Sequence, residues 1–346
     1  MKKIAFFDVK PYDKVWFDKL FKNKYDISYY EYKLNLETAQ LTKGFDVVVA
    51  FVNDDLSEKV LSVLSNNGVE FIAMRCAGYN NVDVKAAYKK IHVARVPGYS
   101  PYAVAEHAFA LLLSLNRKIH RAYARTRDHN FSISGLTGFD LKGKTVGVIG
   151  TGKIGQVFID IAKGFNMNVI AYDLFPLKDR DINYVTLDEL FSKSDVISLH
   201  CPLTGDTYHL IDKTNIEKMK NGVVLINTSR GALIDSEALL NSLKEGKIKA
   251  AGLDVYEEES EFFFEDFSNV IMKDEVLSAL LALPNVIITS HQAFLTDEAL
   301  ENIATTTLEN IEDFYADKPL KNEICYRCEK AGANPNCYKN MNGRCF

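Results

Sequence analysis

The chain of 346 residues lacks any apolar run long enough to cross a membrane, so it is not expected to span one. Its first apolar stretch, Ile4 to Phe7, stops at Asp8 and is too short for the core of a secretory signal. Basic charge is also scarce. There are 41 Lys and Arg against 46 Asp and Glu, and the net charge of −5 argues against nucleic acid or an anionic membrane as the main partner. We therefore expect a cytoplasmic protein that acts on a small molecule.

Cysteine is scarce over most of the chain. Only Cys76 and Cys201 precede residue 325, and no His and Cys spacing in the first 324 residues indicates a metal site. The C-x₂-C pair at 325 and 328 could begin a zinc site, but no second close pair follows it. We expect a flexible, thiol-bearing tail with zinc as the alternative, and stable disulfides are disfavoured in a reducing cytosol. The four cysteines of this tail are Cys325, Cys328, Cys337 and Cys345.

Residues 144–173 carry the most specific pattern in the chain. A short β-branched run ends at three glycines in G-x-G-x-x-G spacing, followed by apolar residues at helical spacing. This order predicts a buried strand, a tight turn whose backbone can approach a pyrophosphate closely, and a helix whose first N–H groups face the phosphates. The turn residues expected to bind the cofactor are Gly150, Gly152, Lys153, Ile154 and Gly155.

A second apolar strand is expected over residues 168–172, and Asp173 follows it. At this distance from the glycines a carboxylate can accept hydrogen bonds from both ribose hydroxyls of an adenosine. No arginine follows at once to bind a 2′-phosphate, so the pattern predicts NAD rather than NADP. The alternative is an ordinary tight turn, which the complete order of strand, helix, second strand and acid disfavours.

Short apolar strands alternate with helical patterns along the whole chain, which predicts an α/β fold with two doubly wound parallel sheets. The helix expected from Pro101 is apolar on more than one face, which indicates burial between domains or subunits. Its basic end could suggest nucleic acid, but the acidic chain favours a solvated or interface helix end. The expected strands are 4–9, 27–32, 47–52, 71–75 and 93–96, then 146–149, 168–172, 195–201, 223–229, 248–253 and 286–290.

Chemistry in doubly wound sheets gathers at the carboxyl ends of strands. Three such ends carry Arg230, the acidic run 257–259 and His291. An arginine can bind a carboxylate and polarise a carbonyl, a histidine can deliver a proton, and a carboxylate can fix its tautomer. Together these groups suit hydride transfer to a 2-oxo acid. The residues alone leave alternatives open, because Arg230 could form a surface ion pair, any one glutamate could be solvated, and His200 rivals His291.

Five segments together resemble the D-isomer-specific 2-hydroxyacid dehydrogenases over about residues 3–324. They are LKGKTVGVIGTGKIG, LHCPLT, INTSRGALID, GLDVYEEE and SHQAFLTDEAL, and the last closely resembles the fermentative D-lactate dehydrogenases of bacteria. The resemblance implies an NAD-dependent oxidoreductase that interconverts pyruvate and D-lactate and regenerates NAD⁺ in fermentation.

The resemblance also assigns roles to individual residues. It implies that Arg230 binds the carboxylate and carbonyl of the substrate, that His291 acts as the general acid and base, and that Glu259 is the partner of His291. It places Ala77, Gly78 and Tyr99 at the substrate carboxylate. The cofactor side is assigned to His200, Cys201, Pro202, Thr228 and Asp254.

By the same resemblance, residues 1–100 and 295–324 form a flavodoxin-like substrate domain, and residues 101–294 form a Rossmann NAD-binding domain. Hinges are expected near Pro101 and Phe294, and residues 325–346 fall outside the resemblance. A homodimer or homotetramer through the NAD domain is implied, which would bury the leucine-rich helix and the segment through Phe131.

Two rival functions remain. A relative acting on a bulkier 2-oxo acid has the same motifs, because pocket size is a three-dimensional property. A nucleotide-sensing scaffold of the corepressor type keeps the fold and the trio but acts by binding partners. Formate dehydrogenases usually have glutamine where Glu259 stands, which sets them aside.

Overall fold

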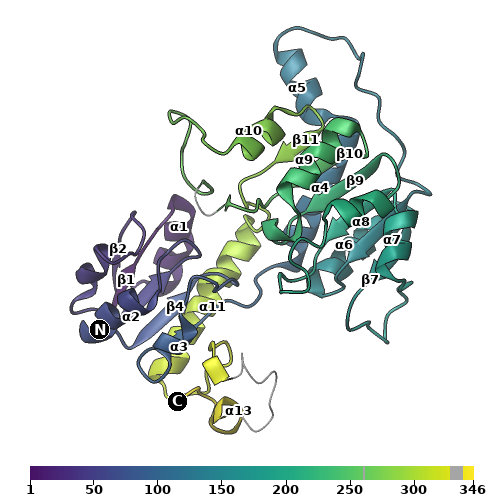
Figure 1. Ribbon diagram of the computed structural model, residues 1–346. Coiled ribbons are helices and arrows are strands. Elements are labelled where there is room, and N and C mark those ends of the chain that lie inside the picture. Colours follow the sequence, from purple (N-terminus) through teal and green to yellow (C-terminus); the bar gives the residue numbers. More distant parts are fainter. Residues whose placement is uncertain (260–261, 328–337) are drawn as a thin grey trace. The chain divides into compact units, whose positions relative to one another are not determined.

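The computed structural model describes residues 1–259, 262–327 and 338–346 (Figure 1). The chain divides into two compact units, and each contains a parallel sheet flanked by helices, as the alternating pattern predicts. Unit 1 comprises Met1–Ser100 and Thr296–Phe346, and unit 2 comprises Pro101–Leu295. Within the described ranges, no helix has the length and apolar character needed to span a membrane.

Unit 1 holds a five-stranded parallel sheet in the order β2-β1-β3-β4-β5, the flavodoxin-like order. The strands β1, β3 and β4 are almost entirely buried, as expected for strands covered on both faces. The strands are β1 Lys3–Phe6, β2 Asp26–Tyr29, β3 Val47–Ala50, β4 Phe71–Met74 and β5 His92–Ala94; the helices are α1 Pro11–Phe21, η1 Thr38–Thr42, α2 Glu58–Asn66, α3 Val84–Ala87, α11 Asp297–Tyr315 and α13 Tyr338–Asn342.

Helix α11 lies far from the rest of unit 1 in sequence but packs against α1 and β4 (Figure 1). The Thr296 side chain caps its start by accepting a hydrogen bond from Ala299 N, at 3.3 Å. Its apolar stripe, including Ala304, Leu308 and Ile311, enters the core that covers one face of the sheet. The final helix predicted from the sequence therefore completes unit 1.

Unit 2 holds a six-stranded parallel sheet in the order β11-β10-β9-β8-β6-β7. Because β6 lies between β7 and β8, the crossovers change direction at its carboxyl end, where ligands bind in such sheets. The strands are β6 Thr145–Ile149, β7 Asn168–Tyr172, β8 Val196–Leu199, β9 Val223–Asn227, β10 Ile248–Leu253 and β11 Val286–Ile288; the helices are α4 Pro101–Arg117, α5 Ile119–Arg127, α6 Lys153–Gly164, α7 Leu187–Lys193, α8 Lys213–Lys218, η2 Gly231–Leu233, α9 Ser236–Glu245 and α10 Glu275–Ala282.

A further parallel pairing extends this sheet beyond β7. Ala171 N donates to Asn183 O, and Val185 N donates to Ala171 O, both at 2.9 Å, so residues 183–185 run beside β7. With this short segment counted as the third strand, the order becomes 3-2-1-4-5-6-7, which is the dinucleotide-binding order 3-2-1-4-5-6 with β11 added beside β10. The sequence gives no strand pattern for this segment, because its apolar run is short and follows a charged loop.

Helix α4 packs into the core of unit 2. Its residues Leu111, Leu112 and Leu115 are buried there, in the same core as Val224 and Ile226 of β9. The helix approaches the sheet closely because Gly252 of β10 has no side chain. The apolar character on more than one face therefore reflects packing on a sheet and on α6 at once.

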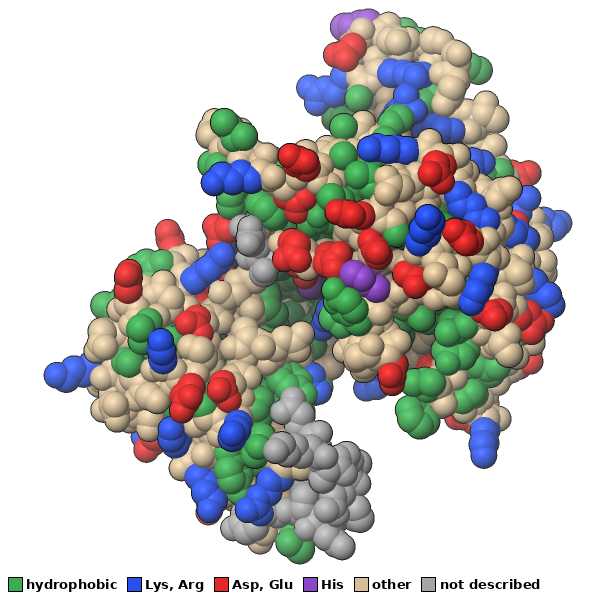
Figure 2. Space-filling model, in the orientation of Figure 1, with side chains coloured by type: hydrophobic (Ala, Val, Ile, Leu, Met, Phe, Trp, Pro, Cys, Tyr) green, Lys and Arg blue, Asp and Glu red, His purple; other side chains and the backbone are tan. Residues whose placement is uncertain are grey.

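Basic side chains gather over α5 on the face shown in Figure 2. Arg125 Nη1 donates to Ser134 O at 2.7 Å, and Lys118 Nζ donates to Thr137 O. These bonds fasten residues 132–137 to α5, so some of these basic side chains have a structural role.

The tail corrects an expectation. A disulfide joins Cys325 and Cys345, whose Cα atoms are 5.6 Å apart, although the sequence analysis disfavoured stable disulfides and expected a flexible tail. The pairing forms because residues 338–346 return to the end of unit 1, where Leu320 N donates to Gly343 O. Cys328 and Cys337 lie outside the described residues.

The close packing of β6 predicts an effect on stability. An added Cβ at Gly147 would lie 2.3 Å from Ser194 Oγ and 2.6 Å from Leu190 Cδ2. Gly147→Ala should therefore destabilise the protein by about 1–3 kcal/mol. Gly164→Ala is the matched control, because nothing lies within 4 Å of its added Cβ, and removing a helical glycine should stabilise by about 0.5–1 kcal/mol. Equal unfolding midpoints for both variants would contradict this packing.

Candidate active site

Two of the three glycines in the turn between β6 and α6 lie against other backbone atoms, and the third is open. Gly150 has φ of 95°, and a Cβ there would lie 2.6 Å from Cys201 N. A Cβ at Gly155 would lie 2.1 Å from Gly150 O, so the helix start needs glycine as well. Gly152, in contrast, has nothing within 4 Å of an added Cβ. Its open side, beside the unpaired N–H groups of the first helical turn, leaves room for a phosphate.

Asp173 holds this turn against the end of β7. Its Oδ2 accepts hydrogen bonds from Thr151 N at 2.6 Å and Thr151 Oγ1 at 3.0 Å, and its Oδ1 accepts from Phe175 N at 2.8 Å. The carboxylate is half-buried and lies beside the glycine turn.

His200 follows β8 and faces the same turn. Its Nε2 lies 2.8 Å from Ser198 Oγ, and its ring packs on Phe158 with centroids 4.9 Å apart. Burial lowers the pKa of His200 to about 3, so the imidazole is neutral at neutral pH and is a poor proton donor. Burial also raises the pKa of the neighbouring Cys201 thiol to about 11, which keeps that thiol protonated.

The turn that carries Arg230 is fixed by the buried side chain of Asn227. Its Nδ2 donates to Arg230 O at 2.8 Å, and its Oδ1 accepts from Ser229 N at 3.0 Å. Ser229 Oγ donates to Cys201 O at 2.7 Å, which ties the ends of β9 and β8 together. A Cβ at Gly231 would lie 2.0 Å from Tyr256 C, so only glycine allows the turn to pack beside the end of β10.

The Arg230 guanidinium is left with few partners. Its Nη1 donates to Ser229 O at 2.7 Å, and among the described residues no carboxylate lies within 4.0 Å of it. The side chain is half-buried. An arginine without an acidic partner can bind the carboxylate of a ligand through its planar fork.

His291 and Glu259 are brought together although 32 residues separate them. His291 Nδ1 lies 2.9 Å from Glu259 Oε1, and Glu259 Oε2 accepts from Tyr256 N at 3.0 Å. The backbone of His291 has φ of 53°, a left-handed conformation that costs energy in a residue with a side chain. The carboxylate orients the ring, so that Nε2 is the nitrogen left for a substrate.

The buried carboxylate of Asp254 holds the segment that carries His291. Its Oδ1 accepts from Thr289 Oγ1 at 2.5 Å and from Gln292 N at 2.9 Å, and its Oδ2 accepts from Ala293 N at 2.8 Å. His291 N also donates to Asp254 O at 2.7 Å. Asp254 therefore fixes both sides of His291 in the chain.

His107 on α4 is a supporting residue that the sequence analysis missed. Its Nε2 lies 3.1 Å from Thr289 Oγ1 and 3.4 Å from Asp254 Oδ1. Phe264 was missed as well; its ring centroid lies 5.9 Å from that of His291. No spacing in the sequence marks either residue, because both contacts depend on tertiary packing.

The other glutamates of the acidic run are placed elsewhere. Glu257 Oε1 lies 2.5 Å from His209 Nε2, and its Oε2 accepts from Ser236 Oγ at 3.1 Å. Glu258 is exposed. Among the three, the fold brings Glu259 to the His291 ring.

Thr228 and Pro202 lie at the ends of β9 and β8. Thr228 Oγ1 is buried and has no hydrogen-bond partner among the described residues. Such an orphaned hydroxyl, together with the open side of Gly152, fits a polar ligand that extends from the glycine turn across the strand ends. The carbonyl oxygen of Pro202 accepts a hydrogen bond from Thr207 Oγ1 at 2.7 Å.

The predicted substrate residues of unit 1 lie after β4 and β5 of that unit. Ala77 O accepts from Arg95 Nη1 at 2.7 Å, and Tyr99 O accepts from Asn302 Nδ2 at 2.7 Å. Gly78 O lies 3.3 Å from Cys76 Sγ. Their backbone is therefore held by side chains of the same unit.

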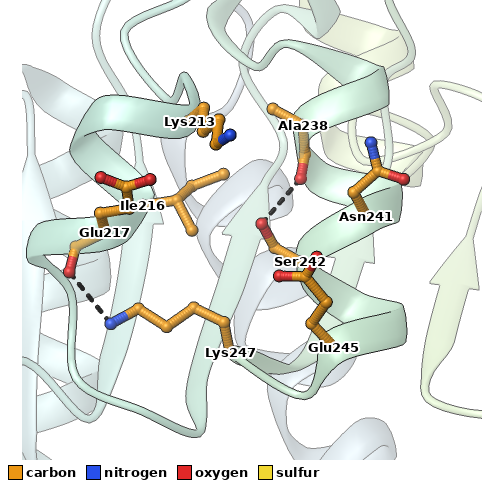
Figure 3. Close-up of a pocket in the computed structure, with 8 residues that line it drawn as sticks. All are labelled: Lys213, Ile216, Glu217, Ala238, Asn241, Ser242, Glu245 and Lys247. Atoms are coloured by element: carbon orange, nitrogen blue, oxygen red, sulfur yellow. Dashed lines mark hydrogen bonds between the residues drawn. The ribbon is translucent and has the colours of Figure 1, made fainter.

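A separate pocket in unit 2 lies between α8 and α9 (Figure 3). Its polar groups bond to the protein itself, because Lys247 Nζ donates to Glu217 O at 3.1 Å and Ser242 Oγ donates to Ala238 O at 2.7 Å. In the described part of the chain, no group of three His, Cys, Asp or Glu could hold a metal. The lining residues are Lys213, Ile216, Glu217, Ala238, Asn241, Ser242, Glu245 and Lys247.

Comparison with known proteins identifies the family. Residues 109–293 match the family described as D-isomer specific 2-hydroxyacid dehydrogenase, NAD binding domain. The D-lactate dehydrogenase of Escherichia coli K12 is 50% identical over 327 residues, which cover 93% of this chain and 99% of that protein.

Solved structures give the same result. The pyruvate reductase of Chlamydomonas reinhardtii has a TM-score of 0.89 at 46% identity, covering 93% of this chain and 98% of that one. The D-lactate dehydrogenase of Aquifex aeolicus, solved with NAD and lactic acid, has a TM-score of 0.80 at 34% identity, covering 91% and 96%. The chain belongs to the D-isomer-specific 2-hydroxyacid dehydrogenases, and its unit 2 carries their NAD-binding domain.

Proposed function

We propose that this chain is an NAD-dependent D-lactate dehydrogenase, which interconverts pyruvate and D-lactate and regenerates NAD⁺. The observation that carries the proposal is the pairing of His291 with Glu259 on the same sheet edge as Arg230, an arginine without an acidic partner among the described residues. The E. coli relative is named for this activity, and the Aquifex structure holds NAD with lactic acid.

When bound, NADH supplies the hydride for the carbonyl carbon of pyruvate. In this proposal the Arg230 guanidinium binds the carboxylate and polarises the carbonyl, an electrostatic contribution of about 3–4 kcal/mol to the barrier. His291 gives the proton from Nε2 to the carbonyl oxygen. Glu259 accepts a hydrogen bond from Nδ1 and stabilises the protonated ring. After each turnover, a proton from solvent restores the acid form of His291. His200, which burial keeps neutral, belongs to the cofactor side.

The remaining assignments have narrower support. Ala77, Gly78 and Tyr99 are assigned to the substrate carboxylate by resemblance, and Pro202, Thr228 and Asp254 to the nicotinamide end. A cytoplasmic location follows from the composition. A homodimer or homotetramer through unit 2 is supported by exposed apolar side chains after α4, with Phe131 73% and Ile133 83% exposed.

The proposal is tested by NADH oxidation with a panel of 2-oxo acids: pyruvate, 2-oxobutyrate, 2-oxoisocaproate and phenylpyruvate. We expect the highest kcat/KM with pyruvate and a product of D configuration. Preference for a bulky acid would keep the mechanism and replace pyruvate as the substrate. Very slow turnover with every acid, together with NADH-dependent self-association, would instead support the scaffold function.

The assignment of His291 is tested by His291→Gln. We expect kcat to fall about 10²–10⁴-fold because the proton donor is lost, while NADH binds normally in a fluorescence titration. His129→Gln is the matched control, since His129 is exposed and lies outside the site. Near-normal turnover of His291→Gln would reject the assignment and return attention to His200. Because the pKa of His200 is about 3, His200 itself should contribute no ionisation to the pH–rate profile above about pH 5.

Cofactor choice is tested by Asp173→Ala. Loss of the hydrogen-bond acceptor for the ribose should weaken the binding of NADH more than that of NADPH, so that the preference for NADH falls. Asp173→Asn serves as a control, since it keeps an acceptor for Thr151 at the turn. Equal loss of affinity for both cofactors in the alanine variant would mean that Asp173 acts only on the shape of the turn.

A further inference from the structure

The Cys325–Cys345 disulfide lies in the part of the chain that the family resemblance does not reach. The E. coli relative is matched over 99% of its length but covers only 93% of this chain. Both half-cystines are buried, with 6% and 2% of their surface exposed. The bond joins residues 338–346 to the segment that follows α11, across a separation of 20 residues.

The returning residues 338–346 dock on unit 1 through specific contacts. Arg344 Nη2 donates to Phe314 O at 2.7 Å and to Asp313 O at 3.1 Å, which places a cation at the C-terminal end of α11. The Phe346 ring stacks on His92 of β5, with centroids 3.9 Å apart. The segment therefore covers the end of α11 and the start of β5.

A buried carboxylate links this docked segment to the sheet. The Glu323 side chain is 1% exposed; its Oε1 lies 2.6 Å from His92 Nδ1, and its Oε2 accepts from Cys345 N at 2.5 Å. Removal of the Cys345 amide would leave one oxygen of a buried carboxylate without its donor, which is strongly unfavourable. The position of Glu323 thus depends on the docked state of Cys345.

The contacts continue from Glu323 to the loop assigned to the substrate. Glu323 forms an antiparallel bridge with Ala94, and Arg95 N donates to Asn322 O at 3.1 Å. The Arg95 side chain then donates from Nη1 to Ala77 O at 2.7 Å and lies over the Tyr79 ring at 4.9 Å. One contiguous set of contacts within unit 1 therefore joins the disulfide to the Ala77 carbonyl.

We propose that Cys325–Cys345 is a reversible thiol–disulfide site whose reduction weakens substrate binding. In a cytoplasmic protein, disulfides that do form are usually redox-sensing. A dithiol reductant supplies two electrons and two protons. Its thiolate attacks one sulfur and breaks the Cys325–Cys345 bond, and its second thiol resolves the mixed disulfide. The products are two cysteine thiols and the oxidised, disulfide form of the reductant.

Reduction removes the covalent link that holds residues 338–346 beside Glu323. The docked segment then exchanges with an open state, and Arg95 loses part of the support that positions Ala77. The substrate part of this inference rests on the proposed activity, whereas the thiol–disulfide part rests on the Cys325–Cys345 bond and on the proposed cytoplasmic location. NADH binding is assigned to unit 2 and should be unaffected.

The full-length protein, prepared without and with dithiothreitol, provides the test. Alkylation and mass spectrometry should find Cys325 and Cys345 joined in the first sample and free in the second. Amide exchange at Cys345 and Leu320 should become at least about tenfold faster on reduction, because both amides are bonded in the docked state. KM for pyruvate should rise about three- to tenfold, with the dissociation constant of NADH unchanged.

Variants separate this site from the other cysteines. Cys345→Ser should show the fast exchange and raised KM without reductant, and dithiothreitol should change it no further. The double variant C328S/C337S is the matched control and should keep the whole redox response. Glu323→Gln, which leaves the disulfide intact, should raise KM under oxidising conditions by weakening the link to His92 and Cys345.

Several results would overturn the proposal. Free thiols at Cys325 and Cys345 in the unreduced protein would remove the site itself. Exchange in Cys345→Ser equal to that of the oxidised wild type would show that the bond does not control docking. Faster amide exchange on reduction, with an unchanged KM for pyruvate, would show that docking of residues 338–346 is not coupled to substrate binding. If pyruvate is not turned over at all, the proposed function fails, and the thiol and exchange measurements still decide the redox site.

Discussion

The buried carboxylate of Asp254 is the interaction on which the candidate site depends most. Asp254 stands at the end of β10 and accepts hydrogen bonds from Thr289, Gln292 and Ala293, which belong to the segment after β11. A carboxylate without exposed surface is stable only when its oxygens are satisfied, so the segment cannot move away cheaply. His291 lies inside this segment in a left-handed conformation, which only such a fixed surrounding maintains.

Close backbone contacts supply a second constraint. Gly155 and Gly231 both lie against backbone where no side chain fits, the first at the glycine turn and the second beside Tyr256. One contact sets the start of α6 after the glycine turn, and the other sets the distance between the Arg230 turn and the end of β10. The glycine turn and the Arg230 turn therefore lie along the same sheet edge of unit 2.

Much of the fold could be predicted from the sequence, because buried parallel strands are written as short apolar runs. Each expected strand is present, but several end early. Strand β8, for example, covers Val196–Leu199 where 195–201 was expected, since His200 and Cys201 form the connection that faces Gly150. The pairing of residues 183–185 with β7 was missed because a single bridge needs too few apolar residues to leave a pattern.

The site was predictable to a different degree. Glycine spacing and Asp173 follow from local chemistry, so the cofactor could be predicted from the chain alone. The choice between His291 and His200 could not, because it depends on burial and on the approach of Glu259, which is distant in sequence. Stable disulfides were disfavoured from the compartment alone, and the Cys325–Cys345 bond could not be predicted because the two residues meet only after the chain folds back.

The most direct test of this account is the protonation of the His291 ring, measured by ¹⁵N–¹H correlation NMR on protein with labelled histidine. His291→Gln assigns the signals. The account predicts that the neutral ring carries its proton on Nδ1, bonded to Glu259, and that Glu259→Ala abolishes this preference. A neutral ring protonated on Nε2, or a spectrum unchanged by Glu259→Ala, would contradict the role of Glu259 in orienting the proton donor.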